Sequence, residues 1–480
     1  MGETPEPHRW RALAVLGVMQ FMVLVDTTIV NVALPSIQRD LVATASQLTW
    51  VVNGYLLAGG GLLLLGGRVA DLAGRRRVFL IGTALFALGS LVSGAAVSIE
   101  MLIAGRLIQG AGEAFASPAA LSLVALLFTE PTERAKAFAI WGGLAGVGAT
   151  AGVVLSGILT SLIHWRWIFF INLPLAFVPL ILVPRLVGMG RRASAKPGSS
   201  LDLVGAVLIT GGLGCVVYGL VEAGHQPSGS LGPILVGVTA IAGFVLVESR
   251  IAAPLVPLRF FANPVRLMGN FSAAFLVSTT TAMFFLATLH MQQVLGYSPV
   301  AAGLAYLPLC LMILPGLAAS ARLTTRVGPL AAASAGLACC CLGALLYSRL
   351  SVGGSYVADL LPAMILVGLG MGITNPAMQN AMLHGVSERD AGLGSGVGYT
   401  VGQLSGALGV AILATLAIRR QQTDLATGVD SLIAQVNGYK LGFTVAAVAL
   451  AASAILVAVL ALLHKQRRQS TAAHHPARPL

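Results

Sequence analysis

Residues 102–121 read LIAGRLIQGAGEAFASPAAL, a segment that is apolar overall yet contains Arg106 and Glu113. About 20 apolar residues in a helix are enough to cross the hydrocarbon layer of a bilayer. A charged side chain at the centre of such a helix costs about 3 kcal/mol on insertion scales. Because this predicted span keeps two charges, the segment indicates a functional site inside a membrane.

The rest of the chain repeats this apolar pattern. Of its 480 residues, 56% are hydrophobic and 10% are charged, and the mean hydropathy is +0.87. Soluble domains carry about 25% charged residues, so the composition excludes that class. We predict an all-α polytopic membrane protein with fourteen spans, near residues 12–34, 47–67, 78–98, 101–128, 136–160, 167–187, 203–223, 230–248, 268–290, 300–320, 328–347, 357–379, 394–417 and 441–463.

The charge of the chain is a topology signal. The formal net charge is +12, from 29 lysines and arginines against 17 aspartates and glutamates. Most of the basic residues fall in every second connection between predicted spans, beginning with the N-terminal segment. Cytoplasmic loops of membrane proteins carry an excess of Lys and Arg. We therefore predict that both termini are cytoplasmic and that the protein binds no nucleic acid.

An internal repeat relates the fourth and twelfth predicted spans. GAGEAFASPAAL begins at Gly110, and GLGMGITNPAMQNAML begins at Gly368. Aligning Pro118 with Pro376 also aligns two glycines of each segment. Parallel repeats of this kind build the two halves of many transporters. The alignment places methionines opposite Arg106 and Glu113, so the predicted ionisable chemistry belongs to one half only.

The polar residues of the fourth span share one helical face. Arg106 and Glu113 are seven residues apart, about 10 Å along a helix axis, which is too far for a direct ion pair. Asp26 in the first span lies at a depth between them. We therefore expect Asp26 to pair with Arg106 and Glu113 to face a central cavity alone. Burial disfavours the charged form of an acid, so Glu113 is a candidate proton carrier.

Four motifs resemble one transporter family. GRVADLAGRR (67–76) resembles the loop signature of the major facilitator superfamily. VDTTIVNVALP (25–35), RLIQGAG (106–112) and WRWIFFINLP (165–174) resemble signatures of its fourteen-span drug:H+ antiporters. The span-five signature departs from the family, because GVVLSG (152–157) has Val153 in place of proline and Ser156 in place of glycine. The resemblance implies a major facilitator fold of two six-helix halves plus two extra central transmembrane helices.

The family resemblance and the residue pattern together give the following expectations. The domains are an N-terminal six-helix bundle (1–187), a linker with two additional helices (188–260), a C-terminal six-helix bundle (261–465) and a cytoplasmic tail (466–480). A proton-coupling group contains Asp26, Arg106 and Glu113. In the loop signature, Asp71 can cap the next helix or pair with an arginine, and either would form a conformational latch of Gly67, Asp71, Gly74, Arg75 and Arg76. A possible substrate cavity is lined by Met19, Met22, Gln109, Trp141, Asn375, Gln379 and Tyr399.

Three further residues and two segments have structural interpretations. Glu222 lies near the end of an extra helix, and we expect it to sit at the membrane interface, with a role in transport as the alternative. Asn172 and Pro174 match the family motif, and we expect them to set helix geometry. The outer segment 419–440 could contain a short amphipathic helix, and the basic segment 185–202 has the composition of a linker.

The leading functional hypothesis is a proton-driven exporter of amphipathic, cationic drugs or antibiotics, working across the cytoplasmic membrane by alternating access. The alternatives are a proton symporter that imports a small nutrient, an exporter of a lipid or of a single antibiotic, and a membrane-embedded enzyme. The eight histidines are scattered, and no Walker-type phosphate loop is present, which disfavours an enzyme or an ATP-driven pump. We expect a monomer with no cofactor and no metal, driven by the proton-motive force, whose partners are a small amphipathic substrate, protons and membrane lipids.

Overall fold

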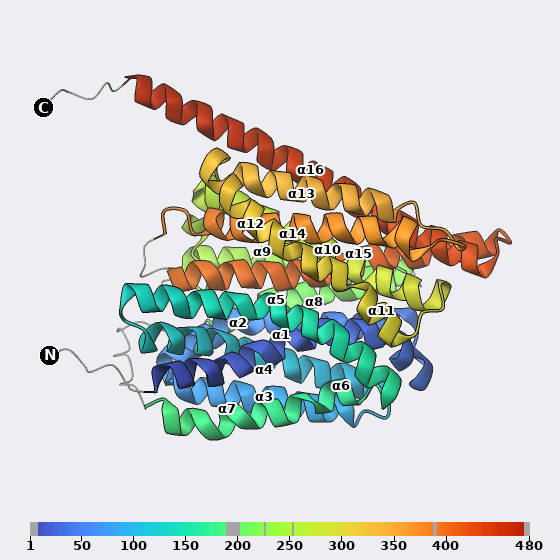
Figure 1. The fold of residues 1–480 in the computed structure, drawn as a ribbon, viewed down its shortest axis with the longest axis horizontal. Helices are drawn as coiled ribbons and strands as arrows, with labels where there is room; N and C mark the ends of the chain where they lie inside the picture. The colour runs from blue at the N-terminus through green and yellow to red at the C-terminus, as the bar shows by residue number, and fades with distance from the viewer. Residues whose placement is uncertain (1–7, 189–201, 225–226, 252–253, 387–390, 475–480) are drawn as a thin grey trace, which may run out of the picture.

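The computed structural model describes residues 8–188, 202–224, 227–251, 254–386 and 391–474, and every regular element within them is a helix (Figure 1). The first part of the chain forms α1 (Arg9–Asp40), α2 (Ala45–Ala73), α3 (Arg75–Gly94), α4 (Ile99–Leu127), α5 (Pro131–Leu162), α6 (Trp167–Phe170) and α7 (Asn172–Leu186). Two central helices follow, α8 (Leu203–Glu222) and α9 (Pro227–Arg250). The last part forms η1 (Leu258–Ala262), α10 (Pro264–Leu289), η2 (His290–Val294), α11 (Pro299–Ala305), α12 (Leu307–Val327), α13 (Pro329–Tyr347), η3 (Tyr356–Leu360), α14 (Leu361–Met382), α15 (Ala391–Ala426) and α16 (Ser431–His474).

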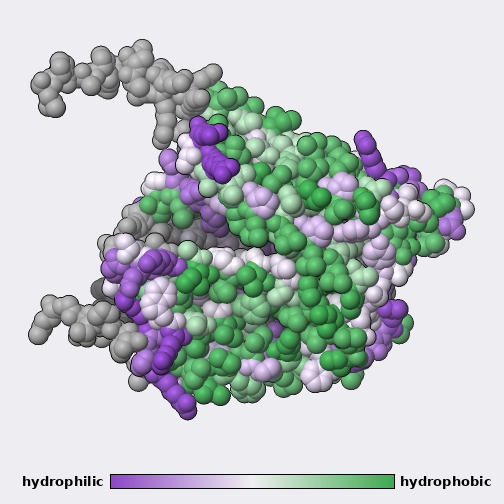
Figure 2. All heavy atoms as spheres, viewed as in Figure 1, coloured by the Kyte–Doolittle hydropathy of each residue, from purple (hydrophilic) through white to green (hydrophobic). Residues whose placement is uncertain are grey.

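The number of predicted spans is confirmed. Fourteen helical segments of the described chain are long and apolar enough to cross a membrane, by length and composition. The helices lie side by side, and α1 begins and α16 ends at the same end of the bundle, on the left of Figure 1. Hydrophilic residues gather at the two ends of the molecule, and a broad hydrophobic band lies between them (Figure 2). This pattern is the one expected for a multi-pass membrane protein.

We name the two ends by residues of α1. The Arg9 face is the end where α1 begins and α2 meets α3, and the Asp40 face is the end where α1 meets α2. Several helices begin with local caps that satisfy free backbone N–H groups. Thr44 and Gln47 form a capping box at the start of α2, and Glu130 accepts hydrogen bonds at the start of α5. A hydrogen bond from the Thr132 hydroxyl holds the pKa of the Glu130 carboxyl below its usual value.

The predicted internal repeat has a counterpart in the packing. Helix α4 packs against α2 and α3, and α14 packs in the same way against α12 and α13. A Cβ atom on Gly112 would lie 2.4 Å from the Phe86 backbone nitrogen on α3. One on Gly370 would lie 2.7 Å from the Gly336 carbonyl oxygen on α13. The aligned glycines therefore serve the same purpose, which is to let two helix backbones approach closely.

The two halves meet at the Asp40 face. The Gln292 side chain donates a hydrogen bond to the Val32 carbonyl (2.7 Å), and Gln293 donates to the Gln38 side chain (2.8 Å). Nearer to the Arg9 face, a Cβ on Gly142 or Gly146 of α5 would have no other atom within 4 Å. The halves are therefore joined at the Asp40 face and also along α2 and α15, and open space lies beside Gly142 and Gly146 of α5 towards the Arg9 face.

The two central helices lie across the seam between the halves. Helix α8 packs against both α2 and α15, and α9 packs against α8. Thr415 on α15 donates a hydrogen bond to the Leu220 carbonyl of α8 (3.0 Å), and a Cβ on Gly61 of α2 would lie 2.3 Å from the Thr210 hydroxyl. The pair is therefore attached to both halves at once.

One segment differs from the expectation. Residues 419–440 form no separate amphipathic helix, because α15 continues to Ala426 and α16 begins at Ser431. The turn between these helices includes Gly428, whose φ of 83° is a left-handed conformation that favours glycine. The helices extend because the segment contains good helix-forming residues on both sides of that turn. Of the predicted linker 185–202, residues 189–201 lie outside the described residues.

A candidate proton-coupling site

The expected pairing of Asp26 with Arg106 is present at the centre of the first half. The Arg106 guanidinium on α4 donates a hydrogen bond to Asp26 on α1, and the two side chains are 2% and 0% exposed. A second guanidinium nitrogen of Arg106 donates to the Val51 carbonyl of α2 (3.1 Å). Breaking a buried ion pair by removing one partner leaves an uncompensated charge, so the pair holds these three helices together.

Neutral polar side chains complete the surroundings of this pair. Gln109 donates to Asp26 (2.9 Å) and to Ser90 (2.8 Å), and it accepts a hydrogen bond from Arg106 (3.0 Å). Asn172 on α7 also donates to Asp26 (3.0 Å). Gln109 is fully buried in this cluster, which corrects the prediction that it lines a substrate cavity. The role of Asn172 was missed, although its place in the WRWIFFINLP motif was the available signal.

Glu113 lies in a different environment. Its Oε1 atom accepts hydrogen bonds from the Tyr399 hydroxyl (2.6 Å) and from the Gln403 amide (3.0 Å), both on α15 in the other half. Its Oε2 atom has no hydrogen-bond partner among the described residues, and none of the ion pairs found there includes Glu113. The expectation that Glu113 faces a cavity alone is therefore wrong, because α15 reaches it through the seam between the halves.

Tyr55 connects the two environments. The Arg106 guanidinium lies over the Tyr55 ring, 4.2 Å from its centroid. The Tyr55 side chain is buried, and its hydroxyl interacts electrostatically with both Glu113 and Asp26. A cation over an aromatic face is stabilised by the ring quadrupole, so Tyr55 adds to the forces that hold Arg106 near Asp26 and away from Glu113.

The residues predicted to line a substrate cavity lie in different places. Met19 and Met22 are both fully buried in the main hydrophobic core, which corrects the prediction for them. Trp141 and Asn375 are half-buried, and Gln379 is exposed. Tyr399 is half-buried and points to Glu113 through its hydroxyl.

Comparison with known proteins identifies the family. The sequence profile described as Major Facilitator Superfamily matches residues 16–410. The chain belongs to the Major Facilitator Superfamily. It is 41% identical to the Lincomycin resistance protein of Streptomyces lincolnensis, over 85% of this chain and 84% of that protein. It is 40% identical to the Puromycin resistance protein pur8 of Streptomyces alboniger over 99% and 96% of the two chains, and 38% identical to the Cephamycin export protein CmcT of Amycolatopsis lactamdurans over 84% of each.

Solved structures of Major Facilitator Superfamily transporters share the fold. An inward-facing bacterial homologue of the lysosomal transporter Spinster superposes with a TM-score of 0.65 at 18% identity, covering 96% of this chain and 97% of that one. The POT family transporter PepTSo gives a TM-score of 0.66 at 15% identity, covering 95% of this chain and 99% of that one. The predicted fold class is thus confirmed, with α8 and α9 as the two helices added between the superfamily's six-helix halves.

The superfamily loop signature joins α2 to α3 at the Arg9 face. Asp71 forms an ion pair with Arg75 (3.0 Å) and does not cap α3, whose N-cap residue is Gly74 with a φ of 100°. Arg76 donates hydrogen bonds to the Val187 and Pro184 carbonyls at the end of α7 (2.9 and 3.0 Å). These contacts all lie within the first half. Gly67 faces Pro118 of α4, because a Cβ there would lie 3.6 Å from the Pro118 side chain.

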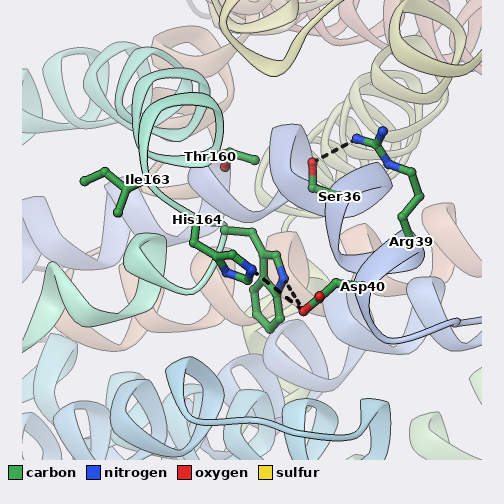
Figure 3. A pocket seen from close by; sticks show the side chains of 7 residues that line it. Ser36, Arg39, Asp40, Thr160, Ile163 and His164 are labelled. Atoms are coloured by element: carbon green, nitrogen blue, oxygen red, sulfur yellow. Dashed lines mark hydrogen bonds and ion pairs between the residues drawn. The ribbon is translucent and has the colours of Figure 1, made fainter.

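A polar cluster at the Asp40 face was not found from the sequence. Asp40 accepts hydrogen bonds from the Trp165 indole and from Arg166, both at 2.9 Å. Figure 3 shows Asp40 and its neighbours around a surface cavity of about 360 Å³. Trp165 and Arg166 of the WRWIFFINLP motif therefore connect α1 to the turn before α6. Glu222 is half-buried at the end of α8.

Proposed function

We propose that this protein is a proton-driven exporter of amphipathic, cationic antibiotics or drugs across the cytoplasmic membrane, by alternating access of its two halves. The named relatives support export and resistance, since their names describe resistance to, or export of, an antibiotic. In this proposal the Arg9 face and both termini are cytoplasmic, because basic residues gather on the segments that lie there. The activity is transport rather than catalysis, it needs no cofactor, and the proton-motive force supplies the energy.

The observation that carries the proposal is the position of Glu113. Its side chain is fully buried in the membrane-spanning region, no cation is paired with it among the described residues, and it lies where the two halves meet. Ionisable residues inside a membrane mark ion pathways far more often than they serve packing. A proton and a cationic substrate would compete for this one carboxylate, which is the exchange that antiport requires.

Asp26 has a different role in this proposal. Its carboxylate is compensated by Arg106 and accepts further hydrogen bonds from Gln109 and Asn172. Asp26 with Arg106 therefore holds the helices of the first half in place, and Glu113 is the acid that exchanges protons.

The test uses purified protein in liposomes that contain a pH-sensitive dye. Lipophilic cations are added to the wild type, to Glu113→Gln and to Asp26→Asn, and proton release is recorded. We expect release on ligand addition in the wild type and its loss in Glu113→Gln, which keeps the size of the side chain. Substrate exchange without proton movement in the wild type would contradict proton coupling and leave a facilitator.

A second candidate is an exporter dedicated to a single antibiotic. The names of three relatives favour it, since each describes one compound. The same liposomes distinguish the two functions when a panel of unrelated compounds is applied. Proton release by many amphipathic cations supports a multidrug exporter, whereas release by one chemical class supports a dedicated one.

A further inference from the structure

We propose that Tyr399 and Gln403 are positioning residues that make the contact between the two halves depend on the protonation of Glu113. The proposal rests on the proposed function and adds a coupling element to it. Tyr399 was expected to contact substrate, and this inference gives it a different role. The argument uses the bonds to Glu113, the packing that permits them, the charges nearby and the strength of the bonds in each protonation state.

The bonds connect one half to the other. Tyr399 and Gln403 are four residues apart on α15, so both side chains project from the same face of that helix. Both donate to a single oxygen of Glu113 on α4, at 2.6 and 3.0 Å. Since α4 and α15 belong to different halves, any rocking of the halves changes these two distances.

Glycines in α2 make this contact possible. A Cβ atom on Gly60 would lie 2.8 Å from the Gln403 Cβ, and one on Gly59 would lie 3.0 Å from the free oxygen of Glu113. Both distances are too short for an ordinary packed side chain. Side chains at these positions would close the gap through which α15 reaches α4. Because Gly59 and Gly60 have no side chains, α2 leaves a gap through which Tyr399 and Gln403 contact Glu113.

The charged groups around Glu113 do not neutralise it, so its ionised carboxylate is stabilised by hydrogen-bond donors such as Tyr399 and Gln403. The titratable or charged groups that act on it within the described chain are Tyr55 on α2, Asp26 on α1, Arg106 on its own helix and Tyr399 on α15. Arg106 is already bonded to Asp26. The two hydrogen bonds to Glu113 at 2.6 and 3.0 Å both come from α15, and the Tyr55 hydroxyl of α2 also interacts with the carboxylate from within the first half.

The strength of these bonds depends on the charge of Glu113. A hydrogen bond to an ionised carboxylate is roughly twice as strong as one between neutral groups. When Glu113 is ionised, both bonds stabilise the arrangement that is closed at the Asp40 face. When it is protonated, both weaken and the halves separate there more easily. A ligand or a proton shifts a conformational equilibrium only by its differential interaction with the two states, and these bonds supply that difference.

The test measures the opening of the Asp40 face directly. Spin labels are placed at Val97→Cys and Val357→Cys, which are exposed there on different halves (81% and 70%), in a chain whose native cysteines are replaced and which retains transport. Interspin distances in nanodiscs are recorded over a series of pH values. In the wild type we expect the long-distance fraction to rise as pH falls. In the double variant Tyr399→Phe with Gln403→Leu, the long-distance fraction should not depend on pH and should equal the fraction found in Glu113→Gln. Each hydrogen bond lost should change the ratio of open to closed protein about tenfold.

Matched variants separate this effect from general damage. Gly60→Ala leaves all three polar side chains in place but displaces Gln403, so it should weaken the pH response in the same direction. Gly54→Ala in the same helix is the control, because its Cβ would meet Leu107 at an ordinary 3.6 Å. Tyr218→Phe on α8 is the control for loss of a hydroxyl, since Tyr218 is 50% exposed and distant from this contact in sequence. Both controls should follow the wild type.

The outcomes distinguish this inference from the proposed function. A double variant of Tyr399 and Gln403 that follows the wild-type pH response overturns the inference, whatever the liposome assay shows. A wild type that moves no protons in liposomes overturns the proposed function, and a pH-insensitive interspin distance in that protein overturns the inference as well. Proton release in the wild type, together with a flat response in the double variant and normal controls, supports both.

Discussion

At the scale of the residue, two buried acids in one half have different partners. Asp26 is paired with Arg106 and surrounded by amide donors. Glu113 accepts hydrogen bonds of 2.6 and 3.0 Å from Tyr399 and Gln403 of the other half, and it also interacts with the Tyr55 hydroxyl of its own half. A paired buried charge is costly to disrupt, because removing one partner exposes the other to a low-dielectric interior. The same substitution, acid to amide, should therefore cost much more stability at Asp26 than at Glu113.

Asp26→Asn should destabilise the protein by about 3–5 kcal/mol, because Arg106 is left buried without a counter-charge. Glu113→Gln should change stability much less, since no cation is paired with Glu113 in the described residues. The double variant Asp26→Asn with Arg106→Gln should recover much of the loss. Thermal unfolding of the four proteins in detergent measures these differences. Equal losses in the two single variants would contradict the structural role of the ion pair.

At the scale of the element, the repeated helices α4 and α14 depend on aligned glycines. Gly112→Ala and Gly370→Ala should each destabilise by about 1–3 kcal/mol, because the added Cβ meets the backbone of α3 or α13 at less than a normal contact distance. Gly142→Ala on α5 is the matched control, since its Cβ would meet no atom within 4 Å. Unfolding midpoints compare the three variants. A Gly112 variant as stable as the control would show that α3 and α4 can separate without cost.

The α2–α3 connection provides a second prediction at this scale. Asp71 and Arg75 are 51% and 31% exposed, and exposed ion pairs contribute about 0–1 kcal/mol. Asp71→Asn should therefore leave the unfolding midpoint nearly unchanged. If the loop acts as a conformational latch, transport should nevertheless fall, because a latch acts on the balance between conformations. Transport in liposomes at matched protein amounts checks this, and unchanged transport would leave Asp71 with only its local pair.

At the scale of the whole molecule, two similar halves carry different chemistry, and α8 with α9 lies across their seam. The orientation of the molecule can be tested at its two faces. An impermeant thiol reagent applied to intact cells should label Val97→Cys at the Asp40 face and should spare Arg77→Cys at the Arg9 face. The reason is that basic segments stay on the cytoplasmic side. The reverse labelling would contradict the proposed orientation.

The sequence by itself determined the fold class, the number of spans and the repeat, because these depend on the length of apolar runs and on residue spacing. It also placed Asp26 opposite Arg106, since helix rise converts sequence separation into depth. Only the tertiary structure decided the surroundings of Glu113, because Tyr399 and Gln403 are far away in the chain and reach it through a gap left by glycines. The burial of Met19, Met22 and Gln109 was decided in the same way. Which face of an apolar helix meets another helix depends on partners that no local pattern specifies.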